Sequence, residues 1–434
     1  MEIGVGILGF GTVGAGVAEG LLRNRETLSR RLGVDVSLKR IADLDIKTDR
    51  GVKIPEGILT TDAMSVIHDP DIQIIVELVG GTGVAKTFIM EALKAGKNIV
   101  TANKKLLAEC GEEIFDAAGK AGVDIYFGAA VGGGIPIIRV LREGLAGNEI
   151  HTIHGILNGT CNYILTRMET ESLAFDDVLK AAQKAGYAEA NPSLDIDGFD
   201  TAHKACILSS LAYGLHVPMD QIQISGIRDL SASDVKLASQ FGYRIKLLAS
   251  IRREGDEIEV SVNPTLVPFS HMLASVNNVF NAVMVNGDLS GDTLYYGRGA
   301  GRAPTASTVI GDIGDIARNI ATGKARYARA VSVANAKKIK VRPAKSVSSK
   351  FYLRLMTLDR AGSLGLITTT LGKHAISVSA LTQKARAGDS TEQGDHVPVV
   401  ILTHMAKAEN LDKALAEISQ AGILSEKPVA MRML

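Results

Sequence analysis

The stretch at residues 182–204 gathers acidic and basic side chains at a spacing that could do chemistry. It reads AQKAGYAEANPSLDIDGFDTAHK and places Glu189, Asp195 and Asp200 ahead of Lys204. Asp200 and Lys204 lie four residues apart, so in a helix they share one face. The helix predicted next, ACILSSLAYGL, is apolar almost all round, which is typical of a buried helix. Because buried charges are unfavourable unless paired or used, we interpret this stretch as a functional site rather than as an ordinary ion pair at a helix start.

Near the amino end, a G-x-G-x-x-G pattern follows a strand-like segment and opens a predicted helix that extends to about Leu32. Its residues are Gly9, Phe10, Gly11, Thr12, Val13 and Gly14. In that context the glycines permit a tight turn and bring backbone N–H groups close to a pyrophosphate. The next strand ends at Asp43, where an acidic residue would hold the ribose hydroxyls of NAD. Arg40 and Lys47 could bind the 2′-phosphate of NADP instead, so the pattern predicts a nicotinamide dinucleotide and favours NAD.

Lys104 lies just past the carboxyl end of a strand-like segment, in Thr101-Ala102-Asn103-Lys104. Ligands of open α/β sheets bind outside such strand ends, so this lysine could lie near the nicotinamide. Two lysines with several carboxylates suit a substrate that carries a carbonyl and an ammonium. The carboxylates would hold the ammonium, and a lysine would donate to the carbonyl oxygen as hydride arrives.

The stretch GAAVGGGI, residues 128–135, could be a flexible turn or could aim backbone carbonyls at a monovalent cation. From the residues alone the turn is favoured. His151, His154 and His203 do not have a metal-ligand spacing, and we interpret them as ordinary residues.

The composition is that of an ordinary globular protein, with 434 residues, 46% apolar and 22% charged. Such a length allows two to three domains. The net charge of +1 gives no reason to expect nucleic acid or an anionic membrane as a partner. Three widely spaced cysteines fit neither a disulfide framework nor a zinc site and favour a reducing compartment. With no signal peptide and no apolar run of membrane-spanning length, we expect a cytoplasmic protein.

The elements that must position these residues fall into three groups. Regular strand–helix alternation over residues 1–134 predicts a parallel, doubly wound α/β sheet of the Rossmann type. Residues 135–301 change to an α+β pattern, predicted to form a mixed sheet with helices on one side. Residues 325–349 carry scattered Lys and Arg with little periodicity and are predicted to be a solvated linker. Residues 350–434 follow the order βαββαβ of the ferredoxin-like arrangement.

The stretch 182–204 resembles the signature of the homoserine dehydrogenase family at every defining position of A-x3-G-Y-x-E-x2-P-x2-D-I-D-G-x-D-x3-K. GFGTVG at the amino end, TANK at 101–104 and NGTCNYIL at 158–165 fall where that family has its equivalents. The tail, with DRAG at 359–362 after its first strand, is similar to an ACT regulatory domain. The likeness covers nearly the whole chain.

The resemblance implies interconversion of L-homoserine and L-aspartate 4-semialdehyde with NAD or NADP, on the route from aspartate to threonine, methionine and isoleucine. Lys104 and Lys204 match the family's catalytic lysines, with Lys204 the favoured proton donor. Glu189, Asp195 and Asp200 match positions of the substrate site.

The same resemblance implies further cofactor contacts. Thr12, Val13 and Lys104 match cofactor-binding positions. The glycine-rich segment that ends at Gly301 resembles one that returns to the cofactor, so the helix after it, 302–322, is expected to pack on the first domain.

A quaternary structure and an effector are also implied. The middle domain, 135–301, would form a homodimer or be part of a homotetramer. The ACT tail would bind an end product, with threonine expected, at a loop containing Asp359 and Gly362.

Two departures from the family pattern alter these expectations. Many relatives have a glutamate where this chain has Gly128, and that glutamate is the anionic ligand of a cation site otherwise made of carbonyls. The matching carbonyls belong to Val131, Gly133 and Ile135, and without the glutamate we expect weak cation binding. Ala361 replaces a proline common in ACT loops, which alters loop stiffness more than chemistry.

Two rival interpretations stay open. One is a different amino-acid or semialdehyde dehydrogenase on the same scaffold, which substrate profiling would separate. The other is a non-catalytic sensor that binds cofactor and amino acid. A sensor would not need Lys104 and Lys204 together with the acidic cluster, so their presence argues against it.

Overall fold

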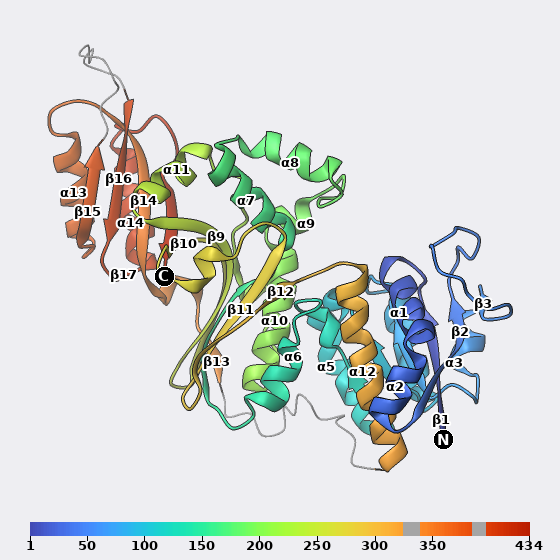
Figure 1. Ribbon diagram of the computed structural model, residues 1–434. Helices are drawn as coiled ribbons and strands as arrows, with labels where there is room; N and C mark the ends of the chain where they lie inside the picture. The colour runs from blue at the N-terminus through green and yellow to red at the C-terminus, as the bar shows by residue number, and fades with distance from the viewer. Residues whose placement is uncertain (324–338, 384–395) are drawn as a thin grey trace.

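The structure is a computed structural model that describes residues 1–323, 339–383 and 396–434. Figure 1 shows three parts in a row: a first part in blue, a middle part in green and yellow, and a C-terminal part in orange and red. One helix, α12, is coloured orange yet lies against the blue helices. None of the helices in the described residues is both long enough and apolar enough to span a bilayer.

The first part is built on six parallel strands in the order β3-β2-β1-β4-β5-β6. This is the Rossmann order, so the predicted doubly wound sheet is confirmed. Its central strands are runs of β-branched residues buried on both faces, as expected for a parallel sheet covered by helices. The strands are β1 (Glu2–Leu8), β2 (Asp35–Ala42), β3 (Leu59–Thr60), β4 (Ile74–Glu77), β5 (Asn98–Thr101) and β6 (Ile125–Tyr126).

The helices of this part differ from the prediction at one place. The single helix expected from Thr12 to Leu32 is wrong, because the backbone leaves helical geometry at Asn24, with φ −104° and ψ 15°. The apolar periodicity continues across this break, so the pattern does not reveal it. The helices are α1 (Thr12–Arg23), α2 (Arg25–Leu32), α3 (Ala63–Ile67), α4 (Val84–Lys94) and α5 (Lys104–Ala121).

The middle part holds a sheet in the order β12-β11-β7-β9-β10, in which these strands run antiparallel to their neighbours. Helices α7, α10 and α11 pack against it. The strands are β7 (Ile150–Ile156), β8 (Gln223–Ile224), β9 (Tyr243–Glu254), β10 (Glu257–Pro268), β11 (Phe280–Gly287) and β12 (Gly291–Arg298). The helices are α6 (Ile137–Arg139), which continues as a π-helical turn, α7 (Gly159–Glu171), α8 (Phe175–Lys184), α9 (Ser193–Ile196), α10 (Phe199–Tyr213) and α11 (Ala232–Gln240).

Helix α12 (Arg302–Thr322) leaves the middle part and packs along α1 (Figure 1). Two glycines of α1 make this close approach possible. A Cβ on Gly16 would lie 2.9 Å from atoms of Arg302, and a Cβ on Gly20 would lie 2.4 Å from Ile310. Real side chains do not tolerate such distances, so the helices could not pack this closely with larger residues.

The C-terminal part has the strand order β18-β14-β16-β15 with helices α13 and α14, which is the order of a ferredoxin-like sheet. Its edge strand β18 also pairs in parallel with β10, so the two sheets are continuous. The elements are β14 (Ser348–Leu358), α13 (Ser363–Lys373), β15 (Val378–Gln383), β16 (His396–Thr403), β17 (Ala406–Lys407), α14 (Ala408–Gln420) and β18 (Val429–Met433).

The linker predicted at 325–349 falls partly on residues 324–338, which lie outside the described residues. Beyond them, Lys340–Val341 forms β13 and pairs in parallel with β10. The end of this segment is therefore part of the sheet rather than solvated along its whole length.

Candidate active site

Asp200 lies at the centre of a buried polar cluster where the first and middle parts meet. Its side chain is 2% exposed, and the Lys204 Nζ lies 2.6 Å from its Oδ2. Lys204 also donates to the Leu157 carbonyl at 2.6 Å. Lys104 forms an ion pair with the other carboxylate oxygen of Asp200. One carboxylate therefore joins the two lysines that the sequence predicted to be catalytic.

Local sequence explains how the two lysines reach the same carboxylate. Gly198 takes a left-handed backbone conformation, φ +90°, and starts α10, so that Asp200 and Lys204 share the helix face predicted from their spacing. Asn103 caps α5 by accepting the Leu106 N–H at 3.2 Å. Lys104 is thus the first residue of α5, immediately beyond the carboxyl end of β5.

A further residue of the cluster, Asn158, was missed by reasoning from the sequence. Its Nδ2 donates to Asp195 at 2.7 Å and to Asp200 at 2.8 Å. Its Oδ1 accepts the N–H of Cys161 at 2.8 Å and so caps α7. The available signal was an asparagine directly before a helix, and this signal predicts only a cap. The side chain serves both purposes, because an amide has donors and an acceptor at once.

The other acidic residues of the 182–204 stretch divide into two groups. Asp195 is tied to the cluster through Asn158 and accepts a hydrogen bond from Thr160 at 3.2 Å. Glu189 lies in the exposed loop before α9. Asp197 pairs with Arg228 at 2.8 Å, and no contact joins it to the lysines within the part of the chain that the structure describes.

The surroundings shift the pKa values of the two lysines in opposite directions. Burial by itself raises the pKa of Asp200, but the charges of Lys204 and Lys104 outweigh burial and hold that pKa below its usual range. Burial lowers the pKa of Lys204, and Asp200 offsets only part of this effect. Burial also opposes the charge of Lys104, yet Asp200, with Asp195 and Glu189 nearby, raises the pKa of Lys104. The cluster therefore pairs an ionised carboxylate with one lysine that loses its proton more easily and one that keeps it.

The glycine turn at residues 9–14 has the shape to receive a pyrophosphate. Gly9 has φ +102°, and a Cβ on Gly14 would lie 2.0 Å from the Gly9 carbonyl oxygen. A Cβ on Gly11 would meet nothing within 4 Å, so space is open in front of α1. Helix α1 has no side-chain cap and no acidic residue in its first turn. Its first N–H groups thus remain available to an anion.

Asp43, directly after β2, is held beside this turn. Its carboxylate accepts the Phe10 N–H at 2.5 Å and the Asp45 N–H at 2.9 Å. The guanidinium of Arg40 instead donates to the Gly57 carbonyl at 3.2 Å. Gly301, with φ +121°, starts α12, whose first residue touches α1. The structure thus gathers the predicted cofactor-binding residues at one end of the parallel sheet.

Comparison with known proteins adds independent information. The family description "Homoserine dehydrogenase, NAD binding domain" matches residues 9–128, and "Homoserine dehydrogenase" matches residues 136–313. A homoserine dehydrogenase of Neisseria gonorrhoeae is 44% identical over 431 residues, covering 99% of this chain and 98% of that protein. The chain belongs to the homoserine dehydrogenase family. It is an oxidoreductase that acts on a CH–OH group, and its cofactor is NAD or NADP.

Solved structures of homoserine dehydrogenases share this fold. The enzyme of Thiobacillus denitrificans superposes with a TM-score of 0.93 at 42% identity, covering 100% of this chain and 98% of that one. A hyperthermophilic archaeal homoserine dehydrogenase solved in complex with NADPH covers 72% of this chain and 97% of its own, with a TM-score of 0.62 at 29% identity.

The loop at residues 128–135, for which we expected a turn with at most weak cation binding, packs under α12. The Gly133 carbonyl accepts a hydrogen bond from Thr308 Oγ1 at 2.7 Å, and the Ile135 carbonyl accepts a backbone N–H at 2.8 Å. Gly128 contributes no side chain, and its N–H donates to the Asp312 carboxylate at 2.8 Å. The described residues hold no group of three or more His, Cys, Asp or Glu side chains placed to bind a metal ion. Cation binding by the carbonyls of Val131, Gly133 and Ile135 stays a prediction.

The predicted effector residues lie together at the start of α13. Asp359 accepts a hydrogen bond from Gln383 at 2.9 Å, and Gly362, with φ +93°, starts the helix. Both line a cavity of about 300 Å³ between the β14–α13 turn and β15.

Proposed function

We propose that this homoserine dehydrogenase interconverts L-homoserine and L-aspartate 4-semialdehyde reversibly, in the synthesis of threonine, methionine and isoleucine from aspartate. The observation that supports this most is the carboxylate of Asp200 between two lysines of opposite behaviour. Lys204 is 9% exposed and Lys104 is 36% exposed, so the second lysine lies at the open side of the cluster. A carbonyl compound could approach from that side.

The two lysines take different tasks in this proposal. Leu157 and Asp200 engage two of the three N–H groups of Lys204, which leaves one for a substrate oxygen. Its lowered pKa suits proton exchange with that oxygen. Lys104, whose pKa is raised, supplies a fixed positive charge beside the alkoxide that develops. Glu189 and Asp195 would hold the substrate ammonium.

Atoms and charges balance in either direction. The nicotinamide dinucleotide, when bound, accepts or supplies the hydride at the substrate carbon. In oxidation, Lys204 takes the hydroxyl proton as the C–H hydride leaves, and in reduction it returns a proton to the oxygen. Thr12 and Val13, at the start of α1, would bind the pyrophosphate through their N–H groups.

The C-terminal part is proposed to be an ACT-type regulatory domain with threonine as its effector, and the assembly a homodimer or homotetramer built through the middle part. Support comes from the ferredoxin-like strand order and from the cavity beside Asp359 and Gly362.

Homoserine oxidation, followed by absorbance of the reduced cofactor, tests this proposal. NAD and NADP are compared in parallel, each with and without threonine, in the full chain. We expect turnover, a preference for NAD, and inhibition that an Asp359→Ala variant relieves while its activity without threonine is unchanged. No turnover with either cofactor in folded protein contradicts the catalytic proposal. Equal inhibition of wild type and the Asp359→Ala variant contradicts only the effector site.

A further inference from the structure

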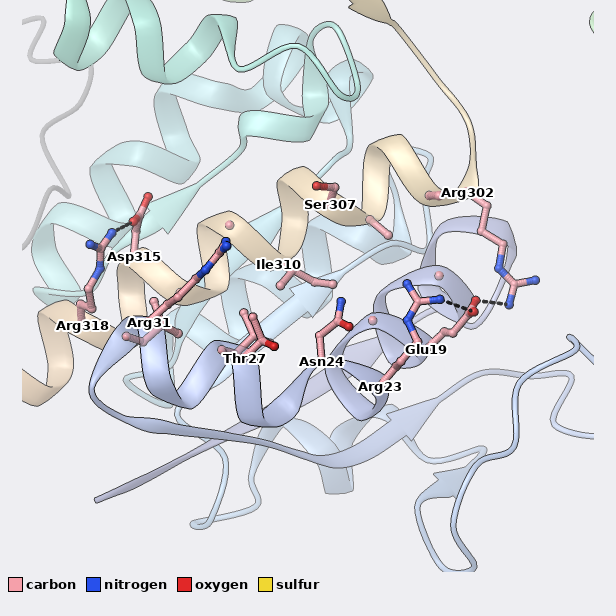
Figure 2. Close-up of a pocket in the computed structure, with 18 of the residues that line it drawn as sticks. Glu19, Arg23, Asn24, Thr27, Arg31, Arg302, Ser307, Ile310, Asp315 and Arg318 are labelled. Carbon is pink, nitrogen blue, oxygen red and sulfur yellow. Dashed lines mark hydrogen bonds and ion pairs between the residues drawn. The ribbon is translucent and has the colours of Figure 1, made fainter.

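A groove of about 690 Å³ runs between α1 and α2 on one side and α12 on the other (Figure 2). It shares no lining residue with the cluster of Lys104, Asp200 and Lys204. Helix faces on the two sides form the groove. On α12, Ala303, Ser307 and Gly311 succeed one another at i,i+4 and face it. The reaction proposed above makes no use of this groove.

Arginine dominates the charge of the groove. The five lining arginines are Arg23, Arg31, Arg139, Arg302 and Arg318. Among the described residues, two carboxylates line it. At one end Glu19 pairs with Arg302 at 3.1 Å and with Arg23 at 3.5 Å, and at the other end Asp315 pairs with two more arginines. Three positive charges therefore remain in excess.

Arg31, which is exposed as its neighbour Arg30 is, is the lining arginine that remains free to bind a ligand. Its guanidinium has no hydrogen bond or ion pair to any other residue that the structure describes. Figure 2 shows its side chain extending from α2 toward α12, between the two paired ends. In addition, the Nε atom of Arg302 is buried and has no hydrogen-bond partner among the described residues. Within that part of the chain, both groups are donors without an acceptor.

Besides Arg31, the middle of the groove is lined by uncharged groups. Asn24, Thr27 and Ser307 supply an amide and two hydroxyls there (Figure 2), and their side chains make no hydrogen bond to the described residues. Thr27 and Arg31 lie four residues apart and so share one face of α2, and Asn24 directly precedes that helix. This pattern offers hydrogen bonds between the charged ends.

Gly311 keeps the groove wide. It lies inside α12, where glycine is less stable than alanine. Packing does not require it, because an added Cβ would meet nothing within 4 Å. A left-handed backbone conformation does not require it either, since its φ is not positive. A side chain at this position would instead project into space that the groove leaves open.

We propose that this groove binds a small molecule that carries two or more phosphoryl groups. Guanidinium forks match phosphoryl oxygens in pairs, and each phosphoryl group brings up to two negative charges, so two of them match the excess of three. A single carboxylate would leave most of that excess uncompensated. The uncharged middle can bind the rest of such a molecule or a longer phosphoryl chain.

Calorimetric titration of the full chain with tripolyphosphate and, separately, with ATP tests the proposal. Saturating NAD is present throughout, so that neither probe is bound at the glycine turn. We expect both probes to bind wild type, and we expect Arg31→Ala to weaken binding at least tenfold. We choose Arg31 because its removal leaves no carboxylate unpaired. Arg30→Ala, an exposed neighbour that does not line the groove, is the matched control and should bind as wild type does.

A second variant fills the groove without changing its charge. Gly311→Leu should fold and turn over homoserine as wild type does, yet bind both probes at least tenfold more weakly. Tighter binding of ATP than of tripolyphosphate assigns the middle of the groove to a nucleoside, and equal binding assigns it to phosphoryl groups alone. The proposal is overturned if neither probe binds wild type, or if Arg30→Ala weakens binding as much as Arg31→Ala. None of these outcomes depends on whether homoserine is the substrate.

Discussion

Two carboxylates, Asp200 and Asp234, are buried at the starts of the consecutive helices α10 and α11, and each pairs with a cation from another part of the molecule. Asp200 is 2% exposed and meets Lys104 of the first part. Asp234 is 0% exposed and meets Arg354 of the C-terminal part, with 2.6 Å between Nε and Oδ1. Both connect two parts of the molecule. By burial alone they could not be told apart.

Their partners distinguish them. Asp234 completes a capping box with Ser231, and the fork of Arg354 contacts both of its oxygens. The same guanidinium also pairs with Glu426, so its donors are taken up by two carboxylates. Asp200 is held by two flexible lysines, one of which is partly exposed. A planar guanidinium fixes geometry, whereas a lysine exchanges protons when its pKa is shifted. We therefore infer that a buried charge cluster is catalytic when it keeps a titratable cation and an open side.

The largest expected effect is on turnover when that cation is removed. Lys204→Met should lower kcat by about 10²–10⁴-fold, the range that a general acid–base contributes. Lys104→Met should also lower kcat, with a further rise in KM, since it removes the charge at the open side. Steady-state kinetics of homoserine oxidation measures both. Lys105→Met, at the exposed neighbour that pairs with Glu109, is the control and should leave the kinetics unchanged. Full turnover of Lys204→Met would contradict the assignment.

The cluster of Asp234 and Arg354 should respond in the opposite way, with a loss of stability and not of catalysis. Arg354→Met leaves Asp234 buried without its cation, which costs about 3–5 kcal/mol of unfolding free energy. Arg25→Met removes the ion pairs with Asp35 and Glu2, at an arginine that is 51% exposed, and should cost at most about 1 kcal/mol. Urea unfolding compares the two variants. If folded Arg354→Met loses kcat, the two clusters do not differ as we infer.

The contrast also explains what could be predicted from the sequence. Local spacing was sufficient for Asp200 and Lys204, which lie one helical turn apart, and for Lys104, which follows a strand end. The pair of Asp234 and Arg354 joins residues 120 positions apart and leaves no local pattern. The same holds for the continuity of the two sheets, which depends on pairing of Thr265 with Arg432.

The fold was predicted correctly where local sequence patterns determine it, and incorrectly where no local pattern marks the structure. Alternation of β-branched runs with amphipathic segments gave the Rossmann sheet, because both periodicities are local. The break at Asn24 was missed, since neither glycine nor proline marks it. Asn158 was missed as a member of the site because its capping role is complete without Asp195 and Asp200.

Asn158 allows a more specific test of the difference between a catalytic and a structural polar side chain. Asn158→Ala removes donors to two carboxylates and should lower kcat/KM by roughly 10–100-fold, as expected for hydrogen bonds to charged groups. The matched variant is Asn162→Ala, because the Nδ2 of Asn162 donates to backbone carbonyls only. It should lower the melting temperature and leave kcat unchanged. Equal kinetic losses in both variants would assign Asn158 to structure alone.

The smallest effect expected is a displaced pH profile. Lys204 must be neutral to take the hydroxyl proton, so kcat for homoserine oxidation should rise tenfold per pH unit until the pH passes the pKa of Lys204. Burial lowers that pKa, which places the inflection below the value of about 10.4 for a free lysine. Reduction of the aldehyde requires the charged form and should fall over the same range.

Arginine variants identify which lysine causes this inflection. Lys204→Arg keeps the charge but does not titrate, so its residual oxidation should lose the inflection. Lys104→Arg should keep it, because the raised pKa of Lys104 would place any titration of that lysine at higher pH. An inflection that survives in Lys204→Arg and vanishes in Lys104→Arg would reverse the two roles. In that case the more exposed lysine exchanges the proton, and the buried one only fixes Asp200.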